Sequence, residues 1–386
     1  MIDFSFTEEQ EMFRQQVRRF AREEVAPRRQ EWDRARKYPW ELVRRFVELG
    51  LADPDMSHVT RGILVEEIAY ADFNTAFPIM RATLPYALDQ LPGVPDHVRL
   101  PLVEGLRQGT KLTGLCFTEP EAGTDMANFR TVAVKEEECW LINGCKNSIS
   151  WANADAYIVT CRTSHHKSVW SLTNILIPAD APGVSPPHVW DDVGTRATPR
   201  GMVHFDNVRV PLNYTVGQEG RGYELVADLF DTNRAYIGLW CVGPAQASVD
   251  EACEHAKKRQ SLGHPISSYQ GISFALAEAQ TLLGAARLLC YKTLWMADKG
   301  QRHSVEGAMC KWWVPDIAFN IAHRCLLMHG HYGYTRDLPF EQRMRDILGW
   351  QIGDGTAEVS KLIIARSMMG KDFTGLGCRA GGAGGG

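Results

Sequence analysis

The segments Thr131-Val-Ala-Val134 and Cys139-Trp-Leu-Ile142 decide the fold, because they begin a series of short runs rich in strand-forming residues. The later runs are Ala156-Tyr-Ile-Val-Thr160, Asn174-Ile-Leu-Ile177, Met202-Val-His-Phe205 and Val208-Arg-Val210. Turn formers such as Asn143-Gly144 punctuate the series. No long helical pattern separates the runs, which disfavours a parallel sheet with crossover helices. The spacing therefore predicts an antiparallel β domain over residues 113–220.

Helical patterns occupy both sides of this stretch. On the N-terminal side, Thr7 and Gln10 have the spacing of a capping box, and helical segments follow up to about residue 108. On the C-terminal side, apolar stripes over 223–259, 269–299, 304–328 and 356–369 predict a helical bundle. We therefore predict an α+β fold with a helical N-terminal domain (1–112), the β domain (113–220) and a C-terminal bundle (221–371), then a disordered glycine-rich tail (372–386).

Composition excludes several classes of function. The net charge of −4 and the lack of a long basic block argue against nucleic-acid binding. No run of 18 apolar residues occurs and the start, Met1-Ile2-Asp3-Phe4, is unlike a signal peptide, so we expect no membrane span and a cytoplasmic protein. The ten cysteines form no CxxC pair, and His165, His166, His329 and His331 lack ligand spacing, so no metal site is predicted.

Motifs in a fixed order identify a family resemblance. The segment Thr118-Glu119-Pro120-Glu121-Ala122-Gly123-Thr124-Asp125 resembles the TEPxAGSD segment of the acyl-CoA dehydrogenases. Further matching motifs are Asn143-Gly144 with Lys146, Gly194-Thr195-Arg196, Phe205 to Pro211, Arg259 to Gln270, Met344-Arg345-Asp346 and Ile352-Gly353-Asp354-Gly355-Thr356. The resemblance covers residues 3–370. It implies a C-terminal four-helix bundle, an FAD cofactor, an acyl-CoA substrate, an electron-transfer flavoprotein or similar acceptor, and a homotetramer built as a dimer of dimers.

The family reaction requires a base that removes the α-proton of an acyl thioester while the β-hydride passes to the flavin N5. Such a base is a carboxylate whose pKa is raised by a dry site. The resemblance places it at Asp354, where most members have Glu; the alternative is that Asp354 only caps the helix that opens at Thr356. Some members carry the base at a position that matches Asn233, which cannot serve.

Gly353 stands where the family usually has Tyr or another large residue. It is either a simple turn glycine or a residue that leaves room in the acyl pocket. Because Asp354 is also one methylene shorter than Glu, the pair favours a cyclic or branched acyl group over a linear chain. The Ile-Gly-Asp-Gly-Thr string resembles that of cyclohexanecarboxyl-CoA dehydrogenases.

The resemblance also implies binding residues. On the substrate side it implies Thr124, Asp231 and Arg234, although Asp231 and Arg234 could instead form a surface ion pair. Residues at positions that touch FAD are Thr118, Ile149, Ser150, Thr356 and Glu358, and those that reach a neighbouring subunit's FAD are Arg259 and Gln270.

Three departures from the family pattern concern these sites. Ser148 stands where an aromatic residue usually covers the flavin ring, and Trp151 is a candidate substitute. Leu327 and His331 replace a Gln and a Gly that usually meet the partner's FAD. The segment between Leu51 and Arg61 is shorter than in the family, which predicts a more open substrate cavity.

Two alternative functions remain open from the sequence. One is a flavin oxidase of the same fold with an Asp base, similar to the nitroalkane oxidases; the CoA-type residues Asp231 and Arg234 argue against it. The other is a non-enzymatic relative that binds nucleic acid, which the net charge of −4 disfavours.

Overall fold

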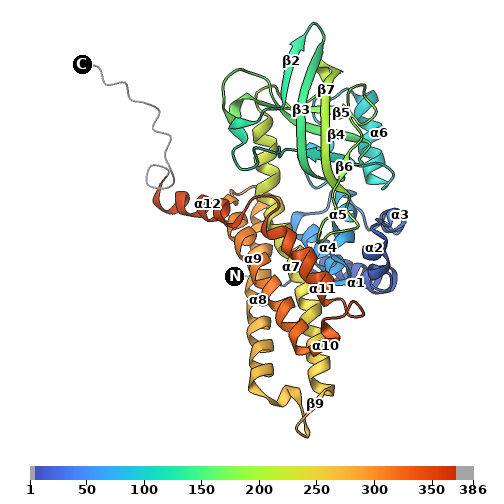
Figure 1. Cartoon of the computed structure of the whole chain (residues 1–386), viewed down its shortest axis with the longest axis vertical. Coiled ribbons are helices and arrows are strands. Elements are labelled where there is room, and N and C mark those ends of the chain that lie inside the picture. The colour runs from blue at the N-terminus through green and yellow to red at the C-terminus, as the bar shows by residue number, and fades with distance from the viewer. Residues whose placement is uncertain (1–4, 371–386) are drawn as a thin grey trace, which may run out of the picture.

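The computed structural model describes residues 5–370, so the tail predicted at 372–386 lies outside the described part. Figure 1 shows the β domain at one end of an elongated molecule and long helices running to the other end. Most of the shorter N-terminal helices lie beside the long ones, below the sheet in this view, and the last of them lies beside the sheet. Helix, sheet and helix thus follow one another along the chain, as the sequence predicts.

The N-terminal helices begin with the predicted capping box. Thr7 accepts a hydrogen bond from the Gln10 N–H at 3.2 Å, and the Gln10 side chain accepts one from the Thr7 N–H. Ser57 caps a later helix by accepting from the Thr60 N–H, so that helix starts at His58. The helices are α1 (Glu8–Phe20), a π-helical turn (Ala21–Val25), α2 (Arg29–Ala35), α3 (Trp40–Glu48), α4 (His58–Ala71), α5 (Phe73–Arg81) and α6 (Asp96–Arg107).

The β domain is one eight-stranded sheet in the order β6-β7-β3-β2-β4-β5-β8, with β1 added beside β4. Its strands are β1 (Thr113–Cys116), β2 (Val132–Glu136), β3 (Cys139–Ser150), β4 (Ala156–Arg162), β5 (Leu172–Pro178), β6 (His188–Val189), β7 (Arg200–Pro211) and β8 (Thr215–Val216). The purely antiparallel prediction needs correction, since β1 and β2 both pair with β4 in parallel. The chain reaches β4 from each of them through the β2–β3 hairpin or its loops, and such long connections permit parallel pairing.

Asn143-Gly144 is not a turn, contrary to the prediction. Both residues lie inside β3, where the register against β7 shifts between Ile142 and Gly144. A Cβ at Gly144 would lie 2.5 Å from the Thr131 Oγ1, so glycine is needed for close approach of two segments. The β2–β3 turn instead contains Glu137, with φ of 53°. The two predicted runs 202–205 and 208–210 are likewise one strand, β7.

The C-terminal domain is built around α7 (Gly222–Lys258), which packs against α8 (Gln270–Asp298), α9 (Ser304–Met328) and α4. Gly243 permits the close crossing of α4, because a Cβ there would lie 2.7 Å from the Tyr70 backbone nitrogen. α10 (Gly330–Gly333), α11 (Phe340–Leu348) and α12 (Ala357–Met369) pack on α9. A small hairpin of β9 (Gln260–Ser261) and β10 (His264–Pro265) forms the tip opposite the sheet in Figure 1.

Helix α8 is long and apolar enough, by length and composition, to cross a membrane, and within residues 5–370 no other helix is. One side of α8 packs into the bundle through Leu276, Leu283 and Leu294. The other side exposes Phe274, Leu288 and Trp295. Core helices of globular bundles have this composition, so α8 alone gives little support for a membrane span.

Two of the quoted motifs meet at the junction of the three domains. The Asp346 carboxylate accepts hydrogen bonds from the Thr195 N–H at 2.6 Å and from the Asn74 side chain at 3.1 Å. Arg345 pairs with Asp33 at 2.9 Å. Burial raises the pKa of the Asp346 carboxyl to about 8, although the Thr195 N–H opposes that shift. The Met344-Arg345-Asp346 motif therefore fixes the segment that leads to Asp354.

Candidate active site

Asp354 lies in the short connection between α11 and α12, with φ of 55°. Aspartate tolerates this left-handed conformation better than most residues. Thr356, not Asp354, caps α12, because the Thr356 hydroxyl accepts from the Val359 N–H. The capping alternative for Asp354 is therefore wrong, and its carboxylate is free for another role.

One carboxylate oxygen of Asp354 is held by α7. The Asn233 side-chain amide donates to the Asp354 Oδ2 at 2.6 Å. The Tyr86 hydroxyl in turn donates to the Asn233 Oδ1. Among the described residues, the other oxygen of Asp354, Oδ1, accepts no hydrogen bond. The site thus presents one tethered and one unengaged carboxylate oxygen.

The electrostatics around Asp354 combine desolvation with nearby cations. Withdrawal from water is the largest effect and raises the pKa of the Asp354 carboxyl above its ordinary value, while Lys311, Arg200 and Arg234 oppose the rise. Lys311 is 1% exposed and donates to the Trp350 carbonyl at 2.7 Å. Burial lowers the pKa of Lys311 to about 8, against the pull of Asp354. A carboxylate with a raised pKa among buried cations is suited to general-base chemistry.

Asp231 and Arg234, predicted on the substrate side, form an ion pair of 2.9 Å. The pairing named in the alternative is therefore present, but it is not a surface pair on the Arg234 side, where the side chain is only 9% exposed. The second Asp231 oxygen accepts from the Ser304 hydroxyl, and the Arg234 Nε has no hydrogen-bond partner in the described residues. Arg234 therefore links Asp231 to the surroundings of Asp354 and keeps a donor available.

Gly353 does not need to be glycine for backbone reasons, because its φ lies outside the left-handed region. A Cβ there would make only ordinary contacts, at 3.5 Å from the Gly349 carbonyl and 3.9 Å from the Trp350 ring. The Trp350 ring stacks on Trp240 at 5.4 Å between centroids. Gly353 does lie in a turn, where its N–H donates to the Gly349 carbonyl at 2.9 Å, and a side chain there would have room beside the Trp350 ring. The structure is therefore compatible with both the turn and the pocket interpretation.

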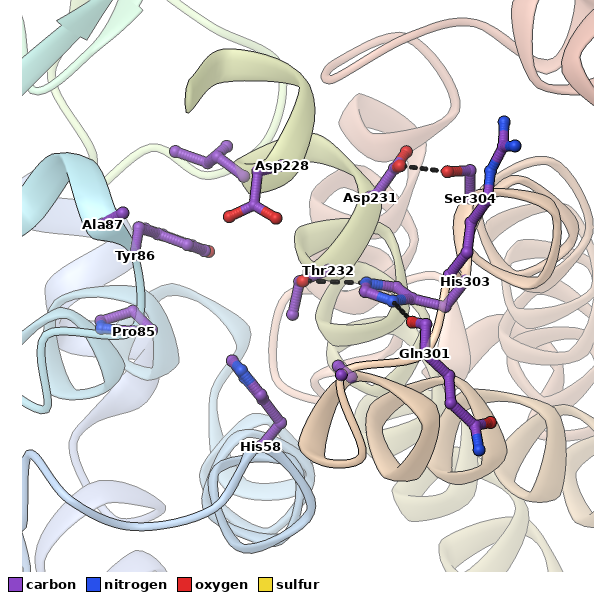
Figure 2. A pocket seen from close by; sticks show the side chains of 14 residues that line it. His58, Pro85, Tyr86, Ala87, Asp228, Asp231, Thr232, Gln301, His303 and Ser304 are labelled. Atoms are coloured by element: carbon purple, nitrogen blue, oxygen red, sulfur yellow. Dashed lines mark hydrogen bonds between the residues drawn. The ribbon is translucent and has the colours of Figure 1, made fainter. Parts of the chain in front are cut away.

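A cavity of about 540 Å³ lies next to this site. Figure 2 shows it between three elements, with His58 from α4, Tyr86 from the segment after α5, and Asp228 and Thr232 from α7. His303, in the α8–α9 connection, closes one side and its ring shares a hydrogen bond with Thr232 at 3.0 Å. The volume is typical of small-molecule sites. Tyr86 lines the cavity, bonds to Asn233, and Asn233 bonds to Asp354. These two hydrogen bonds connect the cavity wall to the Asp354 carboxylate.

The predicted flavin-side residues of the β domain lie at the C-terminal end of β3 and on the loop bonded to it. The Asn147 N–H donates to the Thr118 carbonyl at 2.9 Å, which brings the Thr118 loop against β3. Ser150 pairs in register with Arg200, the same residue whose charge acts on Asp354. Ile149 is buried and Thr118 is exposed. Through Arg200, this end of β3 is therefore linked to the Asp354 segment.

A buried ion pair supports the same loop. The Lys146 ammonium contacts the Glu119 carboxylate at 2.9 Å and the Phe117 carbonyl at 2.8 Å. Glu119 also accepts from the N–H groups of Arg130 and Thr131. Every charged oxygen of Glu119 is thus bonded, which is the condition for a tolerable buried pair.

The other predicted positions are spread more widely. Thr124 is exposed on the Thr118 loop, and Thr356 and Glu358 begin α12. Arg259 and Gln270 are exposed beside the β9–β10 hairpin at the opposite end of the molecule, so one chain does not bring them to the same site (Figure 1). Leu327 and His331 are exposed near the C-terminal end of α9. Trp151 is buried against Tyr38 and Trp40 at 5.0 and 5.2 Å between ring centroids.

Sequence reasoning missed three residues of the site. Asn233 was considered only as a failed base, and Tyr86 and Lys311 were not considered. Lys311 had a signal, because it is the single charge within the apolar run Gly307-Ala-Met-Cys-Lys-Trp-Trp-Val-Pro315. No group of three or more potential metal ligands occurs in the part of the chain that the structure describes.

Comparisons with known proteins show the family of this chain. Residues 7–89, 114–208 and 220–369 match the N-terminal, middle and C-terminal domains of acyl-CoA dehydrogenase, respectively. The short-chain specific acyl-CoA dehydrogenase of Clostridium acetobutylicum is 30% identical over 375 residues, covering 94% of this chain and 99% of that protein.

Solved structures are similar over nearly the whole chain. Butyryl-CoA dehydrogenase from Megasphaera elsdenii has a TM-score of 0.89 and 27% identity, covering 95% of this chain and 100% of that one. Glutaryl-coenzyme A dehydrogenase in complex with glutaryl-CoA has a TM-score of 0.90 and 28% identity, covering 96% and 97%. The chain therefore belongs to the acyl-CoA dehydrogenase family.

Membership defines the class of reaction. The chain is an FAD-dependent oxidoreductase that acts on the CH–CH bonds of acyl-CoA thioesters. The residues present fit the cofactor, since Ser150 pairs with Arg200, whose charge acts on Asp354, and Thr118 lies on the loop bonded to β3. The adjacent Trp151 also has a buried indole N–H without a partner among the described residues. Unsatisfied buried donors of this kind are rare in folded proteins unless a ligand or water completes them.

Proposed function

We propose that this chain removes the α-proton of a cyclic or branched acyl-CoA with Asp354 as base. The proposal rests on the environment of the Asp354 carboxylate. One of its oxygens accepts a hydrogen bond from Asn233, and the positive charges of Lys311, Arg200 and Arg234 act on it. The raised pKa of Asp354 brings its basicity closer to that of a proton acceptor working near neutral pH. Lys311, Arg200 and Arg234 favour the ionised form of the Asp354 carboxyl, the form that can accept a proton.

Each residue of the site has a separate role in the proposed reaction. Asp354 takes the α-proton on its unengaged oxygen, Oδ1. Within residues 5–370 the Asp354 N–H makes no backbone hydrogen bond, so it is available to donate to the thioester oxygen as negative charge develops there. FAD, held at this site, would supply the acceptor for the hydride of the β-carbon. Thr118, Ile149, Ser150, Thr356 and Glu358 would hold that cofactor, and Arg259 and Gln270 would contact the FAD of a neighbouring subunit.

The substrate class follows from the space around the base. The ordinary Cβ contacts at Gly353 show that a side chain is omitted there although the backbone would accept one. The shorter Asp354 requires an α-carbon that sits closer to the backbone than it does with Glu. A ring or an α-branch fills that space beside the Trp350 ring, whereas a linear chain leaves it empty.

The cavity in Figure 2 is the proposed entry for the thioester. Asp231, Arg234 and Thr124 would contact the CoA moiety, and Arg234 retains an unpaired Nε for that purpose. His58 lines the cavity directly after the shortened connection between α3 and α4, which supports the predicted opening of this side. We further propose a cytoplasmic homotetramer, a dimer of dimers, that passes electrons to an electron-transfer flavoprotein or a similar acceptor.

The test is anaerobic bleaching of the bound flavin with a panel of linear, branched and cyclic acyl-CoA thioesters. We expect rapid loss of flavin absorbance with a cyclic or α-branched substrate. Faster bleaching by linear medium chains such as octanoyl-CoA than by every ring compound would refute the substrate class. A flavin that no acyl-CoA bleaches would refute the reaction.

A further inference from the structure

We infer that Asn233 is the positioning residue of the base: together with Tyr86 it fixes which oxygen of Asp354 receives the proton. This inference rests on the proposed function. It extends that function to a pair of residues on α7 and on the cavity wall that do not touch the reacting carbon. The observations are the two consecutive hydrogen bonds from Tyr86 to Asn233 and from Asn233 to Asp354.

The direction of these bonds follows from the groups involved. An ionised carboxylate only accepts hydrogen bonds, so Asn233 must turn its NH₂ group towards Asp354. The Asn233 oxygen then points away, and the Tyr86 hydroxyl is the donor that satisfies it. Both side chains are buried, at 3% exposure for Asn233 and 5% for Tyr86, which makes an unsatisfied amide costly. The tyrosine therefore holds the amide in the one orientation that binds a carboxylate.

The consequence is a selection between the two Asp354 oxygens. Oδ2 accepts the hydrogen bond from the Asn233 side-chain amide at 2.6 Å, which lowers the basicity of this oxygen. The α-proton therefore goes to Oδ1, where it forms an O–H bond as the substrate C–H bond breaks, and the carboxylate becomes a neutral acid. The amide can remain bonded to Oδ2 throughout, so the base does not rotate during the transfer. A short side chain such as Asp benefits from this tether, because a displacement of about 1 Å can cost roughly 100-fold in rate.

Tyr86 also connects the tether to substrate binding. Its ring lines the cavity, with Asp228 and His58 across from it in Figure 2. A substrate that fills the cavity contacts the same residue that orients Asn233. A substrate in the cavity is therefore connected to the Asp354 carboxylate through Tyr86 and Asn233.

The charged and titratable groups that face Asp354 are Lys311 from α9, Arg234 from α7, Arg200 from β7 and Tyr86. The three cations remain when the amide is removed, so the carboxylate stays in a cationic setting but loses its tether. The pH dependence of flavin reduction then isolates the contribution of Asn233.

The experiment measures flavin reduction by an acyl-CoA in anaerobic rapid mixing across pH. It uses four single variants, Asn233→Leu, Tyr86→Phe, Asp354→Asn and Ser248→Ala, and the double variant that combines Asn233→Leu with Tyr86→Phe. Asn233→Leu keeps the volume and removes the donor. We expect its apparent pKa for reduction to rise by about one unit, as for loss of a hydrogen bond to a charged group. The limiting rate at high pH should fall about 10- to 100-fold, with acyl-CoA affinity changed less than about 2-fold.

Tyr86→Phe should shift the profile in the same direction by less, and should add nothing in the Asn233→Leu background, because the two bonds act as one unit. Ser248→Ala is the matched control: it removes a buried side-chain hydrogen bond from the same helix and should keep the wild-type profile. If Asn233→Leu does not retain FAD, Tyr86→Phe decides the question by its own shift.

The outcomes separate the two levels of the argument. If Asp354→Asn abolishes reduction while Asn233→Leu or Tyr86→Phe superimposes on wild type, the positioning role is overturned and the proposed function stands. If Asp354→Asn reduces the flavin as fast as wild type, the base is elsewhere and both fail. A shifted profile in the tether variants but not in Ser248→Ala supports the inference.

Discussion

Lys311→Met should stabilise the protein at neutral pH while impairing the base. Methionine has nearly the shape of lysine without the charge. The pKa of Lys311 is lowered to about 8 because burial outweighs the attraction of Asp354. The buried ammonium is thus a net cost to folding, which the substitution removes. Loss of the hydrogen bond to the Trp350 carbonyl offsets part of the gain.

The magnitude follows from linkage between protonation and folding. A lysine whose pKa falls from 10.5 in the unfolded chain to about 8 in the folded chain binds fewer protons when folded. Its penalty is therefore present at low pH and declines as pH rises from about 8 towards 10.5. With those values the penalty is about 3 kcal/mol at pH 7 and about 1.5 kcal/mol at pH 9.5. The lost hydrogen bond does not titrate, so it shifts both values equally.

The assay compares urea unfolding of wild type and Lys311→Met at pH 7 and pH 9.5, with FAD saturating and protein concentration fixed. The free energy of unfolding of the variant, relative to wild type, should be about 2 kcal/mol higher at pH 7 than at pH 9.5. Lys292→Met, on an exposed side chain, is the control and should stay within about 0.5 kcal/mol of wild type at both pH values. A difference between Lys311→Met and wild type that is the same at both pH values would refute the lowered pKa of Lys311.

Three other outcomes are expected. The double change Gly353→Tyr with Asp354→Glu should move the ratio of kcat/KM values from cyclic towards linear acyl-CoA by about 10- to 200-fold, the range that pocket fit supplies; an unchanged ratio in steady-state assays would contradict the pocket argument. Lys146→Met should lower the free energy of unfolding by about 3–5 kcal/mol and weaken FAD retention, because it leaves the Glu119 charge buried and unpaired; flavin content after gel filtration and urea unfolding measure both. The purified protein should be yellow, with one FAD per subunit and no metal; colourless protein that FAD cannot reconstitute would show that Ser148, Leu327 and His331 have disabled the site.

The sequence predicts element types well where a periodic pattern is long. The helix at 304–328 agrees with the structure at both ends, and the Thr7 capping box is present. The sequence predicts poorly where a short motif is compatible with two structures. Asn143-Gly144 can form a turn or a bulge, and the close approach of Thr131 from an earlier segment decides between them. No short-range pattern contains that information.

The candidate site likewise has one part that the sequence predicts and another that depends on how the helices pack. Asp354 is predictable because a motif marks it, and the structure adds that Thr356 caps the helix instead. The contacts of Asp354 with Asn233, across 121 positions of sequence, and of Asn233 with Tyr86 depend on how α7 packs, which no motif records. Lys311 gives a weak signal as a lone charge among apolar residues, but its partner cannot be read from the sequence.

The substitution Asp354→Asn tests most directly whether Asp354 is the base. The asparagine side chain keeps the shape of aspartate but cannot accept the α-proton. The measurement is the rate of anaerobic flavin reduction by a saturating acyl-CoA in wild type and variant, with binding of the thioester confirmed by calorimetry. We expect retained binding and reduction at least about 1000-fold slower, in line with loss of general-base catalysis. Reduction at the wild-type rate would contradict it.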